Sequence, residues 1–118
     1  MSHPDDYIGQ TLKPLRWVQV KAVVDITICR ELRHLCSFTD EVDHGRVEIE
    51  LRSAHGWTTE LHSLDEYLRA WADIKISHEE LTDVIAVDTR AVRVTTYWRT
   101  AGMEVVCSTS PTPAEVTP

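Results

Sequence analysis

Apolar and polar residues alternate in two separated regions of the chain, and this alternation predicts β-strands. In one strand Val47, Ile49 and Leu51 alternate with charged residues, and the strand before it is rich in β-branched residues. Near the carboxyl end a similar alternation is interrupted by Ala101-Gly102, which predicts a turn. A period of two is typical of strands with one buried and one solvated face. The predicted strands are 16–28, 46–53, 91–98 and 103–107.

Between the two pairs of strands the apolar residues recur every three or four positions, which predicts two helices. Ser63 with Glu66, and Ser77 with Glu80, have the spacing of a capping box, so we expect the helices to begin at these serines. The predicted buried faces are Leu64, Tyr67, Leu68 and Trp71 in the first helix, and Leu81, Val84 and Ile85 in the second.

The order of elements is therefore ββααββ, which predicts an α+β fold with two hairpins in a four-stranded antiparallel sheet and both helices on one face. Such a sheet has two open edges, and open edges invite pairing with another chain. We expect a homo-oligomeric ring that closes the sheets into a barrel, with sites at subunit boundaries. The 118 residues fit one domain, 15–107, between a flexible lead at 1–14 and a disordered, Pro/Thr-rich tail at 108–118.

Charge and composition narrow the possible partners. Hydrophobic residues make up 42% of the chain and the net charge is -7, so the chain is globular and its acidic surface disfavours free nucleic acid. The sequence has no apolar run long enough for a membrane span and no signal-peptide core at its start, which predicts a cytoplasmic protein. In a reducing compartment the three cysteines are expected to be thiols.

Cys36 and Asp43 are the first candidates for chemistry. Cys36 lies in the long segment 29–45 between the first two predicted strands, as either an inert thiol or a nucleophile. Asp43 follows seven positions later, as either a turn residue before His44-Gly45 or an acid that takes the thiol proton and returns it to a substrate atom.

His78 and Glu79 occupy the predicted first turn of the second helix. Glu79 there either complements the helix dipole or presents two acceptors to adjacent N–H donors, such as a guanine-like edge. His78 is either a solvated first-turn residue or a proton donor. For each residue taken alone, the structural role is favoured over the functional one. The presence of His78 and Glu79 together with Cys36 and Asp43 favours a functional site.

A metal centre is not expected from the sequence. The chain has no His-x-His pair, and its other histidines are scattered in sequence. The scattered histidines include His34, His44, His55 and His62.

The residues around Cys36 resemble the QueF family, the nitrile reductases of 7-deazaguanine metabolism, which have the tunnelling fold (T-fold). The family pattern at its nucleophile is Glu-(Phe/Leu)-x-x-Leu-Cys-Pro-x-Thr-x-x-x-Asp. This chain reads Glu31-Leu32-Arg33-His34-Leu35-Cys36-Ser37-Phe38-Thr39-Asp40-Glu41-Val42-Asp43. The His-Glu pair that opens the family's second helix matches His78-Glu79, and the similarity covers about 29–107.

The resemblance implies that Cys36 attacks the nitrile of 7-cyano-7-deazaguanine to give a thioimide, with Asp43 and His78 moving protons. It also implies that Glu79, Glu60 and Leu61 hold the base, which is either free or part of a nucleic acid. Pentameric rings, or decamers of two stacked rings, are the assemblies implied.

The family's cofactor motif, Glu-(Ser/Leu)-Lys-(Ser/Ala)-hydrophobic-Lys, matches only in part. His62 and Asp65 replace the two lysines, so NADPH has weak support, with His62 and Ser63 the candidate contacts. A QueF-like branch uses ammonia instead and forms the amidine of archaeosine-type bases. Reduction and amidine formation both remain open. Alternatives from other classes are a non-catalytic purine- or pterin-binding protein and a structural, ring-forming protein.

Overall fold

The computed structural model describes residues 13–53 and 56–111. Its strands are β1 (Trp17–Gln19), β2 (Asp25–Leu35), β3 (Val42–Arg52), β4 (Trp57–Thr59), β5 (Arg93–Thr100) and β6 (Met103–Thr109). Its helices are α2 (Leu61–Ala70), the short 3₁₀ turn η1 (Trp71–Asp73) and α3 (His78–Thr89).

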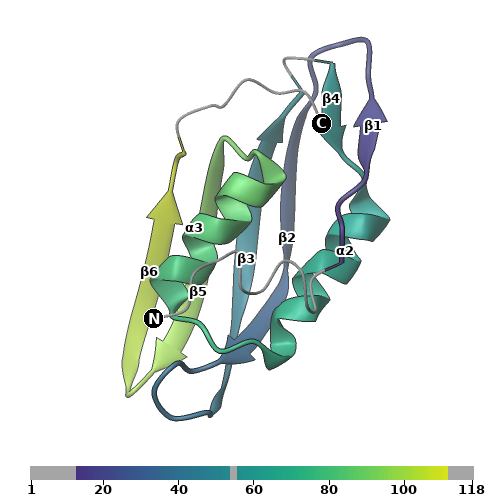
Figure 1. The fold of residues 1–118 in the computed structure, drawn as a ribbon. Coiled ribbons are helices and arrows are strands. Elements are labelled where there is room, and N and C mark those ends of the chain that lie inside the picture. Colours follow the sequence, from purple (N-terminus) through teal and green to yellow (C-terminus); the bar gives the residue numbers. More distant parts are fainter. Residues whose placement is uncertain (1–12, 54–55, 112–118) are drawn as a thin grey trace.

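Four strands form one antiparallel sheet in the order β2-β3-β5-β6, and both α-helices cover the same face of it (Figure 1). The α+β class, the ββααββ order and the one-sided helical layer are therefore as predicted. α3 packs against β5 and β6, whereas α2 and η1 lie over β2. The segment that joins these two helical segments lies at one end of the sheet, beside the last residue of β2.

The hydrophobic core fills the space between the sheet and the helices. Val47, Ile49 and Val94 have no exposed surface, and they face Trp71 and Ile85, which are also fully buried. All the residues predicted for the two helix faces are buried, so the spacing of three and four identified the correct faces.

The prediction of a single strand over 16–28 was wrong. The chain forms β1, which pairs antiparallel with β4 in a separate two-stranded sheet, then bends and continues as β2. Ser53 holds the bend, because its hydroxyl accepts from the Val24 N–H at 2.7 Å. A β-branched run shows that a segment is extended but does not show where it changes partner.

The prediction of a long loop over 29–45 was also wrong. β2 and β3 pair without interruption from Asp25↔Arg52 to Leu35↔Val42, and only the turn 36–41 connects them. Leu32 and His34 are buried, whereas Glu31 and Arg33 are exposed, which is ordinary strand alternation. A histidine at an inward position hid that alternation in the sequence.

Of the two predicted N-caps, one is correct and one is wrong. Ser77 caps α3 as predicted, since its hydroxyl accepts from the Glu80 N–H at 3.1 Å. The expectation for Ser63 was wrong, because Glu60 is the N-cap of α2 and its carboxylate accepts from the His62 and Ser63 N–H groups. These bonds lower the pKa of Glu60 to about 2.

At the chain ends, β6 continues to Thr109, two residues beyond the predicted strand. The predicted lead at 1–14 and tail at 108–118 fall mostly outside the described residues. Among the described residues, the helices are too short and too polar to cross a membrane.

Gly45 lies within β3, where a side chain has no room. A Cβ at this position would lie 2.2 Å from the Tyr97 carbonyl oxygen and 2.5 Å from Cε3 of Trp98, both on the neighbouring strand β5. The missing side chain therefore lets the Trp98 indole lie close against β3. The sequence suggested a turn for this glycine, whereas the structure uses it for close approach.

We expect Gly45→Ala to lower the free energy of unfolding by about 2 to 3 kcal/mol, because the added methyl group forces the Tyr97 carbonyl and the Trp98 indole of β5 away from β3. Urea denaturation followed by tryptophan fluorescence measures the change. His44→Ala, at the exposed neighbouring position, is the control and should change stability by less than about 0.5 kcal/mol. Equal stabilities of the two variants would contradict this packing argument.

Candidate functional site

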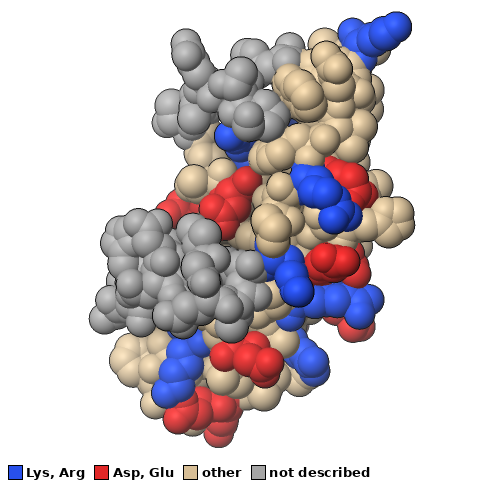
Figure 2. All heavy atoms as spheres, turned by 45° about the vertical axis from the view of Figure 1, so that its right-hand side comes forward, with Lys and Arg blue, Asp and Glu red and all other residues tan. Residues whose placement is uncertain are grey.

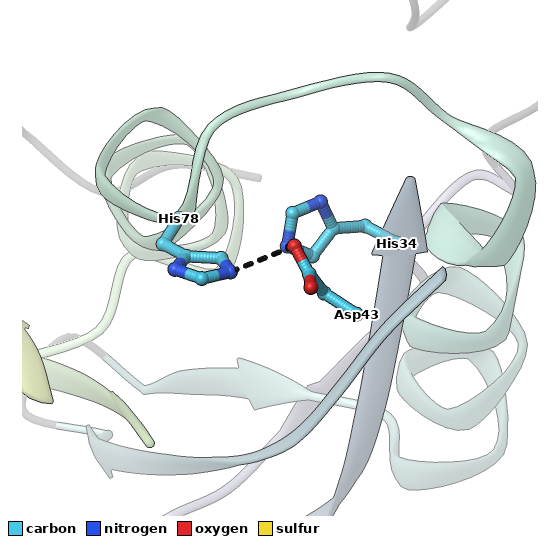
Figure 3. A group of neighbouring side chains, drawn as sticks. All are labelled: His34, Asp43 and His78. Carbon is cyan, nitrogen blue, oxygen red and sulfur yellow. Dashed lines mark hydrogen bonds and ion pairs between the residues drawn. The ribbon is translucent and has the colours of Figure 1, made fainter. Parts of the chain in front are cut away.

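His34, Asp43 and His78 meet at one end of the sheet (Figure 3). His34 and Asp43 are opposite each other on β2 and β3, and His78 is the first residue of α3. His78 Nε2 lies 3.1 Å from Asp43 Oδ2, and His34 Nε2 lies 3.8 Å from the same oxygen. The predicted pair of Asp43 and His78 is therefore in contact, with a second imidazole beside it.

A short parallel bridge brings His78 to this place. Leu35, at the end of β2, donates its N–H to the Ile74 carbonyl at 3.0 Å and accepts from the Ile76 N–H at 3.2 Å. The segment after η1 is thus fixed beside the last residue of β2. Ser77 then caps α3, and His78 follows directly over Asp43.

Trp98 supports both imidazoles. Its ring is stacked on His78 with centroids 4.4 Å apart, and it meets His34 edge to face at 4.8 Å. The indole Nε1–H donates to the Thr96 hydroxyl at 2.8 Å, which fixes the ring plane. Because Gly45 gives the indole its room, the glycine, the tryptophan and the histidines form one packed unit.

His34 is the site residue that sequence reasoning missed. Its side chain is 1% exposed, and burial lowers its pKa, so the ring is neutral near pH 7. The ring Nδ1 lies 2.9 Å from the Leu35 carbonyl oxygen. A histidine at an inward strand position, two residues before a candidate nucleophile, was the available signal.

Cys36 lies in the turn that follows β2. Bonds from the Thr39 hydroxyl and from the Phe38 and Thr39 N–H groups lower the pKa of its thiol. Partial burial and the charge of Asp43 oppose that shift, which places the thiol within electrostatic reach of the carboxylate. The turn is closed by the Cys36 N–H, which donates to the Glu41 carbonyl at 2.8 Å. These hydrogen bonds stabilise the thiolate form of Cys36 relative to the thiol form.

The three cysteines are thiols, as predicted. Burial and the nearby Glu79 raise the pKa of Cys107, in contrast to Cys36. In a Cys29→Ser background we therefore expect iodoacetamide to alkylate Cys36 first, and at a pH below that needed for Cys107. A lowered pKa means that the thiolate persists as the pH falls, so this order should be clearest near pH 7. Peptide mass spectrometry measures it, and faster labelling of Cys107 would contradict it.

The other predicted contacts lie elsewhere in the chain. Glu60, Leu61, His62 and Ser63 are at the start of α2, whereas His78 follows its far end (Figure 1). α2 has 10 residues, so the two groups are separated by about 15 Å of helix. Within one chain the structure does not bring them together.

Two of these residues have structural roles in the structure. The Glu60 carboxylate caps α2 and also accepts from the Arg16 guanidinium at 2.9 Å. Ser63 is fully buried, and its hydroxyl accepts from the Arg16 N–H and donates to the Glu60 carbonyl. The expectation that Ser63 contacts a cofactor is therefore not supported, because its hydroxyl is already satisfied. Leu61 and His62 are exposed.

Glu79 follows His78 in the first turn of α3 and is exposed. It raises the pKa of Cys107 on β6, so its carboxylate lies within electrostatic reach of that strand. Within residues 13–53 and 56–111, its carboxylate forms no hydrogen bond or ion pair. Both of its oxygens are therefore available to a ligand.

The scatter of histidines in sequence was the ground for expecting no metal. For His34 that ground was wrong, since the fold places its Nε2 within 4.8 Å of donor atoms of Asp43 and His78. His44 and His62 do not join this group, and His55 lies outside the described residues.

A groove of about 680 Å³ lies beside β2 and α2, and none of Cys36, Asp43 and His78 lines it. Arg30 and Arg69 border it, but both pair with Asp65, at 3.1 and 2.8 Å. On the face drawn in Figure 2, basic and acidic side chains are intermixed. The described residues of that face therefore form no continuous basic strip for a phosphate backbone.

Comparison with known proteins identifies the fold. The structure is similar to the crystal structure of the archaeosine synthase QueF-Like in the apo form, with a TM-score of 0.66 and 18% sequence identity. The similarity covers 75% of this chain and 94% of that one. No protein-family model and no curated protein matches the sequence. The chain is thus an α+β protein with the ββααββ fold of that synthase.

Proposed function

We propose that the chain is a QueF-type enzyme that captures the nitrile of 7-cyano-7-deazaguanine on Cys36 and converts it to an amidine. The observation that carries the proposal is the turn after β2. It lowers the pKa of the Cys36 thiol and returns the chain to Asp43, which pairs with His78 at 3.1 Å. A nucleophile and a proton-transfer pair are the minimum for covalent addition to a nitrile.

The first step forms a bond between Cys36 Sγ and the nitrile carbon. Asp43 takes the thiol proton, and the Asp43–His78 pair delivers a proton to the nitrile nitrogen, so the triple bond becomes the C=N bond of a thioimide. Ammonia then adds to the same carbon, the C–S bond breaks, and Cys36 leaves as a thiolate. The net reaction adds ammonia to a nitrile and needs no oxidant or reductant.

The base is held by its edge in this proposal. Glu79 is exposed in the first turn of α3 and has both carboxylate oxygens available. A carboxylate matches the ring N–H and exocyclic amine of a deazaguanine. Because Glu60 and Leu61 lie at the other end of α2, they reach the base only from a second copy of the chain in a ring-shaped homo-oligomer.

The start of α2 favours ammonia over NADPH as the second substrate. Asp65 stands where the family motif has its second lysine, and it is paired with Arg30 and Arg69. The Ser63 hydroxyl is buried and satisfied. Asp65 offers a phosphate of NADPH no ammonium group, and the two arginines beside it are already engaged by its carboxylate, which weakens the support for NADPH.

The test is intact-mass spectrometry of the chain incubated with 7-cyano-7-deazaguanine in a buffer that contains a metal chelator. We expect a mass increase equal to the whole ligand, which ammonium chloride releases as the amidine and NADPH does not release. The same incubation with an oligonucleotide that carries the base tests the polymeric substrate.

The outcomes separate the proposals. If NADPH releases the adduct, the reaction is a reduction of the nitrile and not the formation of an amidine. If the ligand binds reversibly and forms no adduct, the chain is a purine- or pterin-binding protein and not an enzyme of this type. A folded chain that neither binds nor reacts with either substrate would overturn both.

A further inference from the structure

One buried nitrogen of the site has no hydrogen-bond partner among the described residues. It is Nε2 of His34, whose side chain is 1% exposed. The opposite ring nitrogen, Nδ1, lies 2.9 Å from the Leu35 carbonyl oxygen, which can only accept. Nδ1 therefore carries the proton, and Nε2 of the neutral ring presents its lone pair.

That lone pair faces an anion. Asp43 Oδ2 lies 3.8 Å from His34 Nε2, and each atom is an acceptor. His78 Nε2 reaches the same oxygen from α3 at 3.1 Å. Asp43 Oδ2 is engaged by His78, whereas His34 Nε2 is left unsatisfied in a buried place beside it. A cation bound among the three atoms engages that lone pair and removes the cost of leaving it unpaired.

We propose that His34 Nε2, Asp43 Oδ2 and His78 Nε2 are the ligands of a divalent transition-metal ion, with zinc the best match. The proposal goes beyond the nitrile chemistry and does not depend on it. Two imidazoles and one carboxylate are a donor set typical of zinc, whereas magnesium and calcium prefer oxygen ligands alone.

The spacing of the three donors suits a small ion. Tetrahedral zinc holds its ligand atoms roughly 3.4 Å apart. The two distances to Asp43 Oδ2, 3.1 and 3.8 Å, lie on either side of that value, and all three donors lie within 4.8 Å of one another. Small rotations of side chains that are already in place complete the geometry.

The surroundings also match a metal site. The Leu35 carbonyl orients His34 in the way that an outer hydrogen bond orients a metal-bound histidine. Trp98 holds both rings from one side. The side chains of Asp43 and His78 retain 17% and 10% exposure, which gives an ion a route of entry and a water molecule a fourth position. A bound ion engages the Asp43–His78 pair, so metal binding and the proton relay proposed above exclude each other.

The test is cobalt titration of the full chain after dialysis against a chelator. We expect one Co²⁺ per chain, the visible absorption of tetrahedral cobalt, no thiolate charge-transfer band, and displacement by Zn²⁺. His34→Gln and His78→Gln should each weaken binding by at least about 100-fold. His44→Gln, next to Asp43 but exposed, is the matched control and should bind as the parent chain does.

Folding is checked separately, because His34 is buried. Circular dichroism and thermal unfolding are recorded for each variant, and His78→Gln decides the question if His34→Gln does not fold. The absence of tetrahedral cobalt absorption, or binding that survives in folded His78→Gln, would overturn the proposal. The nitrile adduct is measured in chelator, so either proposal can fail while the other stands.

Discussion

Replacing Cys36 by alanine is expected to abolish the covalent adduct and to lower turnover by at least about 10⁴-fold, because no other group in the site supplies a comparable nucleophile. Cys36 is part-exposed in a surface turn, so the substitution leaves no cavity in the core and should not lower stability appreciably. Intact-mass spectrometry measures the adduct, and amidine release measures turnover.

Cys29→Ser is the matched control for this variant. Cys29 is exposed on β2, and its thiol contacts Glu48 on the neighbouring strand rather than the site. It should retain the parent rate. An adduct that persists in Cys36→Ala and disappears in Cys29→Ser would show that Cys29 is the nucleophile. That result would contradict the proposed function.

Asp43→Asn is the second large effect that we expect. The amide has the shape of the carboxylate but cannot take the thiol proton or carry it to the nitrile nitrogen. Adduct formation should slow by about 10²- to 10⁴-fold, the range typical of general acid–base catalysis. Stopped incubations analysed by intact mass, with chelator present throughout, give the rate.

Asp40→Asn controls for the loss of one negative charge near Cys36. Asp40 lies in the same turn, is exposed, and pairs with Lys75 rather than with the histidines. Its substitution should leave the adduct rate within about twofold of the parent, as expected for an exposed ion pair. Equal rates in Asp43→Asn and Asp40→Asn would show that Asp43 is only a structural residue.

The sequence predicted where His78 lies in its helix but not which residue it contacts. The capping pattern at Ser77 correctly predicted that His78 opens a helix, because a cap is a contact within four residues. Its contact with Asp43 depends on the parallel bridge between Leu35 and Lys75, which joins segments 40 residues apart in sequence. No local period encodes such a bridge.

The sequence by itself determined the ββααββ order, the buried faces of both helices and the spacing from Cys36 to Asp43. These features follow from repeats of two and of three to four residues and from a short motif, which are local properties of the chain. The same reasoning failed at Ser63, where a carboxylate three residues earlier is the better acceptor for the first N–H groups of α2.

Only the tertiary structure decided the composition of the site. Cross-strand register placed His34 opposite Asp43, and the missing side chain of Gly45 allowed Trp98 to support both imidazoles. The tertiary structure also placed Glu60 at the end of α2 that is distant from His78. Register and packing are set by contacts between segments that are distant in sequence, and their energies depend on neighbours that a pattern along the chain cannot identify.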